Sequence, residues 1–153
     1  MATAGGTIRV ELIGDKELKR KLVGERADKP VSRFLDRAAF TIQGAARKKA
    51  PVDTGRLRNS IGTESPSTRS RTVGPSVKYG EWVETGTSPH YPPLGALQGW
   101  AKRHGMSAAA LQQSIGTRGT KAQPFMRPAA DESEDAIANL VPILAAEIES
   151  AYQ

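Results

Sequence analysis

The chain has 153 residues, of which 38% are hydrophobic and 5% aromatic, which is enough for one domain whose core is built mainly from Ala, Leu, Ile and Val. It contains no cysteine, which excludes a disulfide framework and thiolate chemistry, and it has no apolar run of about 18 residues that would span a bilayer. The first six residues lack the charged start and apolar centre of a signal peptide, so we expect synthesis in the cytoplasm and no contact with a membrane.

The formal net charge of +6 is distributed unevenly along the chain. Residues 1–60 hold 14 Lys and Arg against 7 Asp and Glu, whereas residues 128–153 hold six acidic residues and no basic one. This division fits two solvated faces. It equally fits head-to-tail contacts between copies in a ring, with the basic surplus turned toward nucleic acid.

The N-terminal third predicts a strand followed by two helices. Residues 7–13 alternate between apolar and polar side chains, which indicates a half-buried strand. Asp15 is placed to cap a short helix that runs to about Val23. Pro30 suits the first turn of a longer helix that ends near Lys49. The longer helix carries one apolar stripe, which consists of Val31, Phe34, Leu35, Ala38, Ile42, Ala45 and Ala46.

The end of this helix is strongly basic, with Arg47, Lys48 and Lys49 in sequence. These charges complement the negative end of the helix dipole, which is sufficient to explain their position. They are also our candidates for residues that face DNA.

A sharp corner follows at residues 50–55. Pro51 ends the long helix because it pushes the residue before it out of the helical region. Asp53 and Thr54 can each cap a short helix from Gly55 to about residue 60. We interpret the corner as a structural joint or a contact between subunits, and its candidate residues are Pro51, Asp53, Thr54, Gly55, Arg56 and Arg58.

A polar hairpin and a short helix are predicted next. Residues 61–65 and 68–73 form the hairpin around Pro66 and Ser67, and residues 79–85 form a helix that Gly86 ends. Glu84 lies at the end of that helix, where the dipole disfavours a carboxylate. We therefore expect a cationic partner for Glu84, with Arg56 or Arg58 as the candidates, and we include Glu84 in the joint.

The C-terminal half is predicted to be helical. Two short helices form a helical hairpin over about residues 93–119, the second of them capped by Ser107. The last helix spans about residues 128–151, and Pro142 should kink or break it. The sequence therefore predicts a single α+β domain, with the helical hairpin inserted between the sheet and the last helix.

No motif for catalysis or for binding a metal or a cofactor is present. His90 and His104 do not have the spacing of a metal-binding pair, and neither the Gly-x-Ser-x-Gly motif of serine hydrolases nor the complete phosphate loop occurs. We predict that the protein is not an enzyme, and that it has no catalytic residue, metal ligand or cofactor.

Three segments in the same order resemble one family of proteins. They are residues 50–61 (APVDTGRLRNSI), residues 79–87 (YGEWVETGT) and residues 124–129 (PFMRPA). This set resembles the head–tail joining or tail-completion family of long-tailed bacteriophages, which includes minor tail proteins of the Z type. The helical hairpin with Trp100 is similar to that of the Z-type subset.

The resemblance implies a structural virion protein with a long helix and a C-terminal helix packed on a small, mostly antiparallel sheet. It further implies a homo-oligomeric ring, commonly of six subunits, at the neck or the head-proximal end of the tail. Its partners would be other neck and tail proteins and the double-stranded DNA that passes through the ring without sequence-specific contacts. A tail-terminator or head-closure ring protein and a basic DNA-binding module remain the alternatives.

Overall fold

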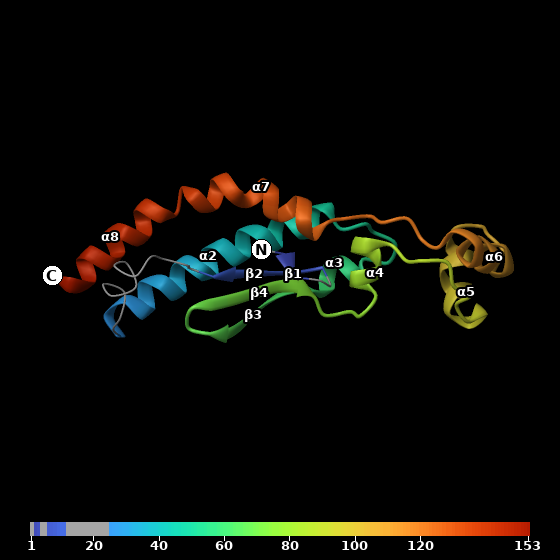
Figure 1. The fold of residues 1–153 in the computed structure, drawn as a ribbon, viewed down its shortest axis with the longest axis horizontal. Helices are drawn as coiled ribbons and strands as arrows, with labels where there is room; N and C mark the ends of the chain where they lie inside the picture. Colours follow the sequence, from blue (N-terminus) through green and yellow to red (C-terminus); the bar gives the residue numbers. More distant parts are fainter. Residues whose placement is uncertain (1, 4–5, 12–24) are drawn as a thin grey trace.

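A computed structural model describes residues 2–3, 6–11 and 25–153 of the protein. The predicted short helix over residues 15–23 and the end of the predicted first strand lie outside the described residues. The protein has the predicted α+β fold, in which a small antiparallel sheet lies against helices (Figure 1). The elements are β1 (Ala2–Thr3), β2 (Thr7–Glu11), α2 (Glu25–Lys49), α3 (Arg56–Ser60), β3 (Ile61–Ser67), β4 (Ser70–Pro75), α4 (Gly80–Thr85), α5 (Leu94–Arg103), α6 (Ala108–Arg118), α7 (Met126–Ala138) and α8 (Val141–Tyr152).

The sheet has the strand order β1-β2-β4-β3, and every neighbouring pair is antiparallel. One face of the sheet is apolar, because Ile8, Ile61 and Val73 alternate with polar residues and are buried against helices. The turn between β3 and β4 falls at residues 68–69 rather than at the predicted Pro66 and Ser67. Pro66 is tolerated inside β3 because β3 is an edge strand, where a missing N–H group interrupts no ladder.

Helix α2 packs on the apolar face of the sheet and along α7 and α8 (Figure 1). The predicted apolar stripe is confirmed, since all its members except the half-buried Ala45 are buried. The prediction that Pro30 begins the helix is wrong, because α2 already includes Glu25. Ala27 explains the extension. It is fully buried in a cluster with Val31 and Leu144, and such packing offsets the single hydrogen bond that a proline in the second turn forfeits.

Arg71 fastens the sheet to α2 from the inside. Its guanidinium is almost fully buried and donates hydrogen bonds to the Asp36 carboxylate at 2.5 Å and to the hydroxyl of Ser32, both on α2. The remaining N–H groups reach the carbonyl oxygens of Ser67 at 2.9 Å and Ser70 at 3.0 Å. A buried charge is tolerated only when paired and hydrogen-bonded, and this arginine satisfies both conditions.

The C-terminal segment forms two helices. The break predicted at Pro142 is confirmed, since α7 ends at Ala138 and the proline lies in the first turn of α8. A proline is well suited to the first turn of a helix, where its missing N–H group has no intrahelical partner. The two helices run end to end along α2 (Figure 1).

The predicted helical hairpin is confirmed as α5 and α6, and Ser107 caps α6 by accepting a hydrogen bond from the N–H of Ala110. We call residues 88–119 the arm and the other described residues the body. The arm projects from one end of the elongated molecule, and α8 lies at the opposite end (Figure 1).

The two chain segments that enter and leave the arm are joined at Thr87 and Thr120, which we call the neck. Their backbones exchange two hydrogen bonds of 3.1 Å, and their hydroxyl groups lie 2.9 Å apart. A glycine flanks each threonine, and both glycines have a positive φ of 72°. A Cβ atom on Gly119 would lie 1.9 Å from the carbonyl oxygen of Thr87, so the neck requires glycine at this position.

Candidate interaction surfaces

The predicted corner turns the chain from α2 into α3, but neither predicted residue caps α3. Gly55 occupies the N-cap position with a φ of 79°, and no side chain of the cap accepts a hydrogen bond there. A positive φ favours glycine over every other residue. The backbone of Gly55 therefore forms the corner, and Asp53 and Thr54 remain available for other contacts.

Asp53 instead binds the arm. Its carboxylate accepts hydrogen bonds from the guanidinium of Arg103, at 2.9 Å to Nε, and lies 3.3 Å from Nε2 of His104. The hydrogen bonds from Arg103 hold the pKa of Asp53 below its ordinary value of 3.8. The ring of His104 stacks on that of Trp100 with their centroids 4.0 Å apart. The joint is thus fastened to the C-terminal end of α5.

A cleft of about 610 Å³ lies between the joint, α4 and α5. Its lining combines aromatic and apolar side chains, among them Tyr79, Val83 and Trp100, with the charged groups of Arg56, Arg103 and Asp53. Arg56 and the exposed Val52 on this surface make the cleft a candidate site for part of another protein.

Glu84 does not pair with Arg56 or Arg58 as predicted. Its carboxylate accepts hydrogen bonds from the backbone N–H groups of Phe125, Met126 and Arg127 at 2.7, 2.9 and 3.0 Å. These are the first free donors of α7, whose N-terminus carries a partial positive charge. The expected positive partner of Glu84 is therefore the end of another helix, not an arginine side chain.

The basic residues at the end of α2 have different surroundings. Arg47 donates hydrogen bonds of 3.1 and 2.7 Å to the carbonyl oxygen of Ile61, and Lys49 lies 2.5 Å from Glu132 on α7, where its hydrogen bond lowers the pKa of Glu132. Lys48 is exposed. Arg47 and Lys48 line a shallow depression of about 350 Å³ together with Arg58 and Asn59. The joint and the end of α2 thus share one basic surface, which we call the basic depression.

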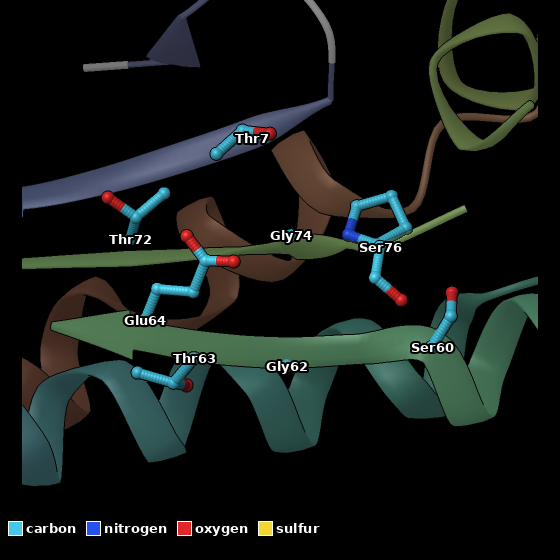
Figure 2. Close-up of a pocket in the computed structure, with 9 residues that line it drawn as sticks. Thr7, Ser60, Gly62, Thr63, Glu64, Thr72, Gly74 and Ser76 are labelled. Carbon is cyan, nitrogen blue, oxygen red and sulfur yellow. The ribbon is translucent and has the colours of Figure 1, made fainter. Parts of the chain in front are cut away.

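The outer face of the sheet carries a polar groove of about 310 Å³ (Figure 2). Gly62 and Gly74 are paired across β3 and β4 and form its floor, while Thr7, Glu64 and Thr72 surround them. Thr63, which the same view shows pointing to the other side, instead approaches Gln43 of α2 at 3.3 Å. Pro75 also lines the groove, but no large apolar or aromatic side chain of the kind that encloses a small-molecule substrate does so.

These surfaces bear on the class of protein. Among residues 2–3, 6–11 and 25–153 no group of three potential metal ligands gathers, and within the same ranges no helix has the length and apolar character that crossing a bilayer requires. The prominent features are ion pairs, helix caps, a basic depression and exposed apolar side chains. Such features make these surfaces candidates for contacts with other macromolecules.

Comparison with protein families points to this class more directly. Residues 15–86 match the family described as "Bacteriophage HK97-gp10, putative tail-component". The resemblance to a head–tail joining family of tailed phages is thereby confirmed. The matched stretch ends at Gly86, the residue before Thr87, so it does not include the arm. No curated protein and no solved structure matches the chain.

Sequence reasoning missed three residues that organise these surfaces. Arg71 gave no signal of its burial, because a polar hairpin rich in Ser, Thr and Arg suggests an exposed ribbon. Arg103 and His104 were not among the predicted site residues, although both contact Asp53. A basic residue and a histidine in sequence at the end of a helix were the only signal of that contact.

Proposed function

We propose that the protein forms a homo-oligomeric ring at the head–tail connector of a tailed phage or prophage, as a neck or tail-completion protein through which DNA passes. The observation that carries this proposal is the match of residues 15–86 to a phage tail component. This stretch contains the joint and α2, so the residues that resemble the joining family are also those that shape the basic depression. We regard the chain as one domain, with the arm inserted in it.

The joint supports the ring. The turn at Gly55 sets the direction in which α3 follows α2, and Asp53 holds the arm through Arg103, while Arg56 and Arg58 are exposed beside them. Exposed arginines next to a rigid corner suit contacts with a neighbouring subunit. Asp53→Ala and Gly55→Val should therefore reduce ring assembly, measured as mass in solution, and normal assembly of both variants would contradict this role.

The basic depression supports contact with DNA in the lumen. Lys48 and Arg58 are exposed, and Arg47 borders the same hollow. Such a surface binds phosphates without reading bases, and its affinity falls steeply with salt. Lys48→Glu should slow DNA ejection from assembled particles and leave ring mass unchanged, because Lys48 is exposed in the depression and lies outside the joint.

The position of the protein along the virion is tested by imaging particles made without it. Heads without tails beside finished free tails would support the joining role. Heads that lose their DNA would support head closure, and tails of irregular length would support a tail terminator. A DNA-binding module is the remaining alternative. It predicts that the isolated monomer binds duplex DNA tightly while never forming a ring.

A further inference from the structure

The outward face of α8 is apolar. Val141 and Ile143 are 51% and 44% exposed, Ala145 and Ala146 beside them are exposed, and Leu144 is the one residue of α8 that is buried. A surface helix normally presents polar residues to water. A helix that exposes apolar side chains on this scale marks a site of protein contact.

Exposed acidic side chains lie on the same two C-terminal helices, most of them on α7. Asp131, Glu134 and Asp135 on α7 and Glu149 on α8 are exposed, and no ion pair forms at any of them within the described part of the chain. The other two acids of this segment are engaged, since Glu147 contacts Arg33 and Arg37, and Glu132 contacts Lys49. The exposed side of these helices therefore combines apolar side chains on α8 with acids on α7 and α8 that no ion pair neutralises. We call it the acidic helical surface.

The arm has the complementary character. Residues 88–119 contain three basic residues, Lys102, Arg103 and Arg118, and no acidic one. Lys102 and Arg118 are exposed, and in the described ranges they take part in no ion pair. The arm also exposes Leu94 and Met106, at 43% and 46%. It lies at the opposite end of the molecule from α8 (Figure 1).

Two complementary surfaces at different places on one chain generate a head-to-tail contact between copies; here they are the arm at one end of the molecule and the surface along α7 and α8 (Figure 1). Such a heterologous contact closes into a ring when the rotation between subunits is suitable. Apolar side chains supply the contact, and opposite charges around them set its partner and orientation. Self-pairing of either end would place like charges together.

We propose that the arm of one copy binds the acidic helical surface of the next copy. The basic residues of the arm face the acids of α7 and α8, and the exposed apolar side chains of the two surfaces pack between them. This inference rests on the proposed ring and names the two surfaces that build it. It assigns the arm, which lies outside the matched stretch, to subunit contact rather than to DNA.

The test uses two charge-reversed variants of the full chain. One carries Lys102→Glu and Arg118→Glu on the arm, and the other carries Asp131→Lys and Glu134→Lys on α7. These side chains are exposed, so the variants should fold, which circular dichroism checks. A control with Glu64→Lys and Lys78→Glu reverses the same kinds of charge at exposed positions on the body.

Each variant alone should assemble about 10-fold more weakly or worse, because both of its surfaces then carry the same sign. An equal mixture should assemble again with alternating copies, since each reversed surface meets a complementary one in the other variant. Native mass spectrometry measures both results. The control variant should assemble as the wild type does.

Three results would overturn the inference. The first is wild-type assembly in both variants, and the second is loss of assembly that mixing does not restore. The third is normal assembly of the α7 variant together with its exclusion from particles, which would mean that another virion protein covers this surface. In each case the proposed ring survives, because the wild type still assembles. A wild type that stays monomeric at all concentrations would instead contradict the proposed ring itself.

Discussion

The carboxylate of Glu84 accepts a hydrogen bond of 2.7 Å from the backbone N–H of Phe125, 41 residues further along the chain. Phe125 is fully buried in the core beside Met126 and Ala129. One carboxylate in the stretch that matches the tail component thus fixes the start of α7, which lies beyond that stretch. It also fixes the point at which the chain returns from the arm to the body.

Replacing Glu84 by glutamine should destabilise the protein by about 1–2 kcal/mol, because one amide oxygen cannot accept three N–H groups and carries no charge. Thermal unfolding measures the change. Glu81→Gln, on the exposed side of the same helix, removes an equal charge and should change the free energy of unfolding by less than about 0.5 kcal/mol. Equal effects of the two substitutions would contradict the capping role.

Gly119→Ala should weaken the backbone hydrogen bonds between Thr87 and Thr120 that form the neck of the arm. The positive φ alone costs an alanine about 1–3 kcal/mol, and the new Cβ atom would lie against the carbonyl oxygen of Thr87. Hydrogen exchange should accelerate at Thr87 and Thr120, whose N–H groups are bonded across the neck.

Gly105→Ala is the matched control for the neck. Gly105 also has a positive φ, of 64°, but no atom lies within 4 Å of its added Cβ. It shares the backbone strain without the clash. The prediction fails if both variants accelerate exchange at the neck to the same extent.

Asp36→Asn should destabilise the protein by about 1–3 kcal/mol, since it leaves the buried guanidinium of Arg71 without its counter-charge. Asp28→Asn removes the carboxylate of an exposed pair with Arg69 and should cost at most about 1 kcal/mol. Urea unfolding at neutral pH compares the two variants. If Asp28→Asn lowered the free energy of unfolding more than Asp36→Asn, the burial of Arg71 would not explain the contribution of its ion pair.

The contact between Asp53 and the arm should weaken in acid. Because the pKa of Asp53 is lowered in the folded protein, the contact contributes fully above its ordinary value of 3.8 and is lost as the pH falls through the lower folded value. Trp100 reports the loss, since it stacks on His104 beside Asp53. Its fluorescence is followed in a Trp82→Phe background.

In Asp53→Asn the group that titrates is absent. The fluorescence of Trp100 should then have its acid-state value already at neutral pH and change little below pH 3.8. An unchanged acid transition in this variant would assign the effect to another carboxylate.

Local rules were sufficient for much of the fold. The stripe of α2, the change to strand periodicity after Ser60, the end of α4 at Gly86 and the break at Pro142 each depend on a few neighbouring residues, and each is found in the structure. The predicted start of α2 was wrong because Ala27 is buried in a cluster with Leu144 of α8, and such a tertiary contact cannot be derived from neighbouring residues. Local propensity gives way to such packing.

The contacts of the joint could not be derived in the same way. Glu84 and Asp53 were both recognised as carboxylates that need partners, but their partners lie 41 and 50 residues away along the chain. From the sequence, Arg56 and Arg58 were the expected partners of Glu84, and Asp53 was expected to cap the short helix that follows it. Only the path of the chain through the arm brings α7 and Arg103 to the joint.

The neck separates changes in the arm from the rest of the fold. Because Thr87 and Thr120 are hydrogen-bonded to each other, the arm begins and ends at one point in space. Its length and sequence can therefore vary without moving β4, α4 or α7, much as a loop can be lengthened at a hairpin. If the arm joins copies, the diameter of an assembly becomes adjustable through a segment on which the core does not depend.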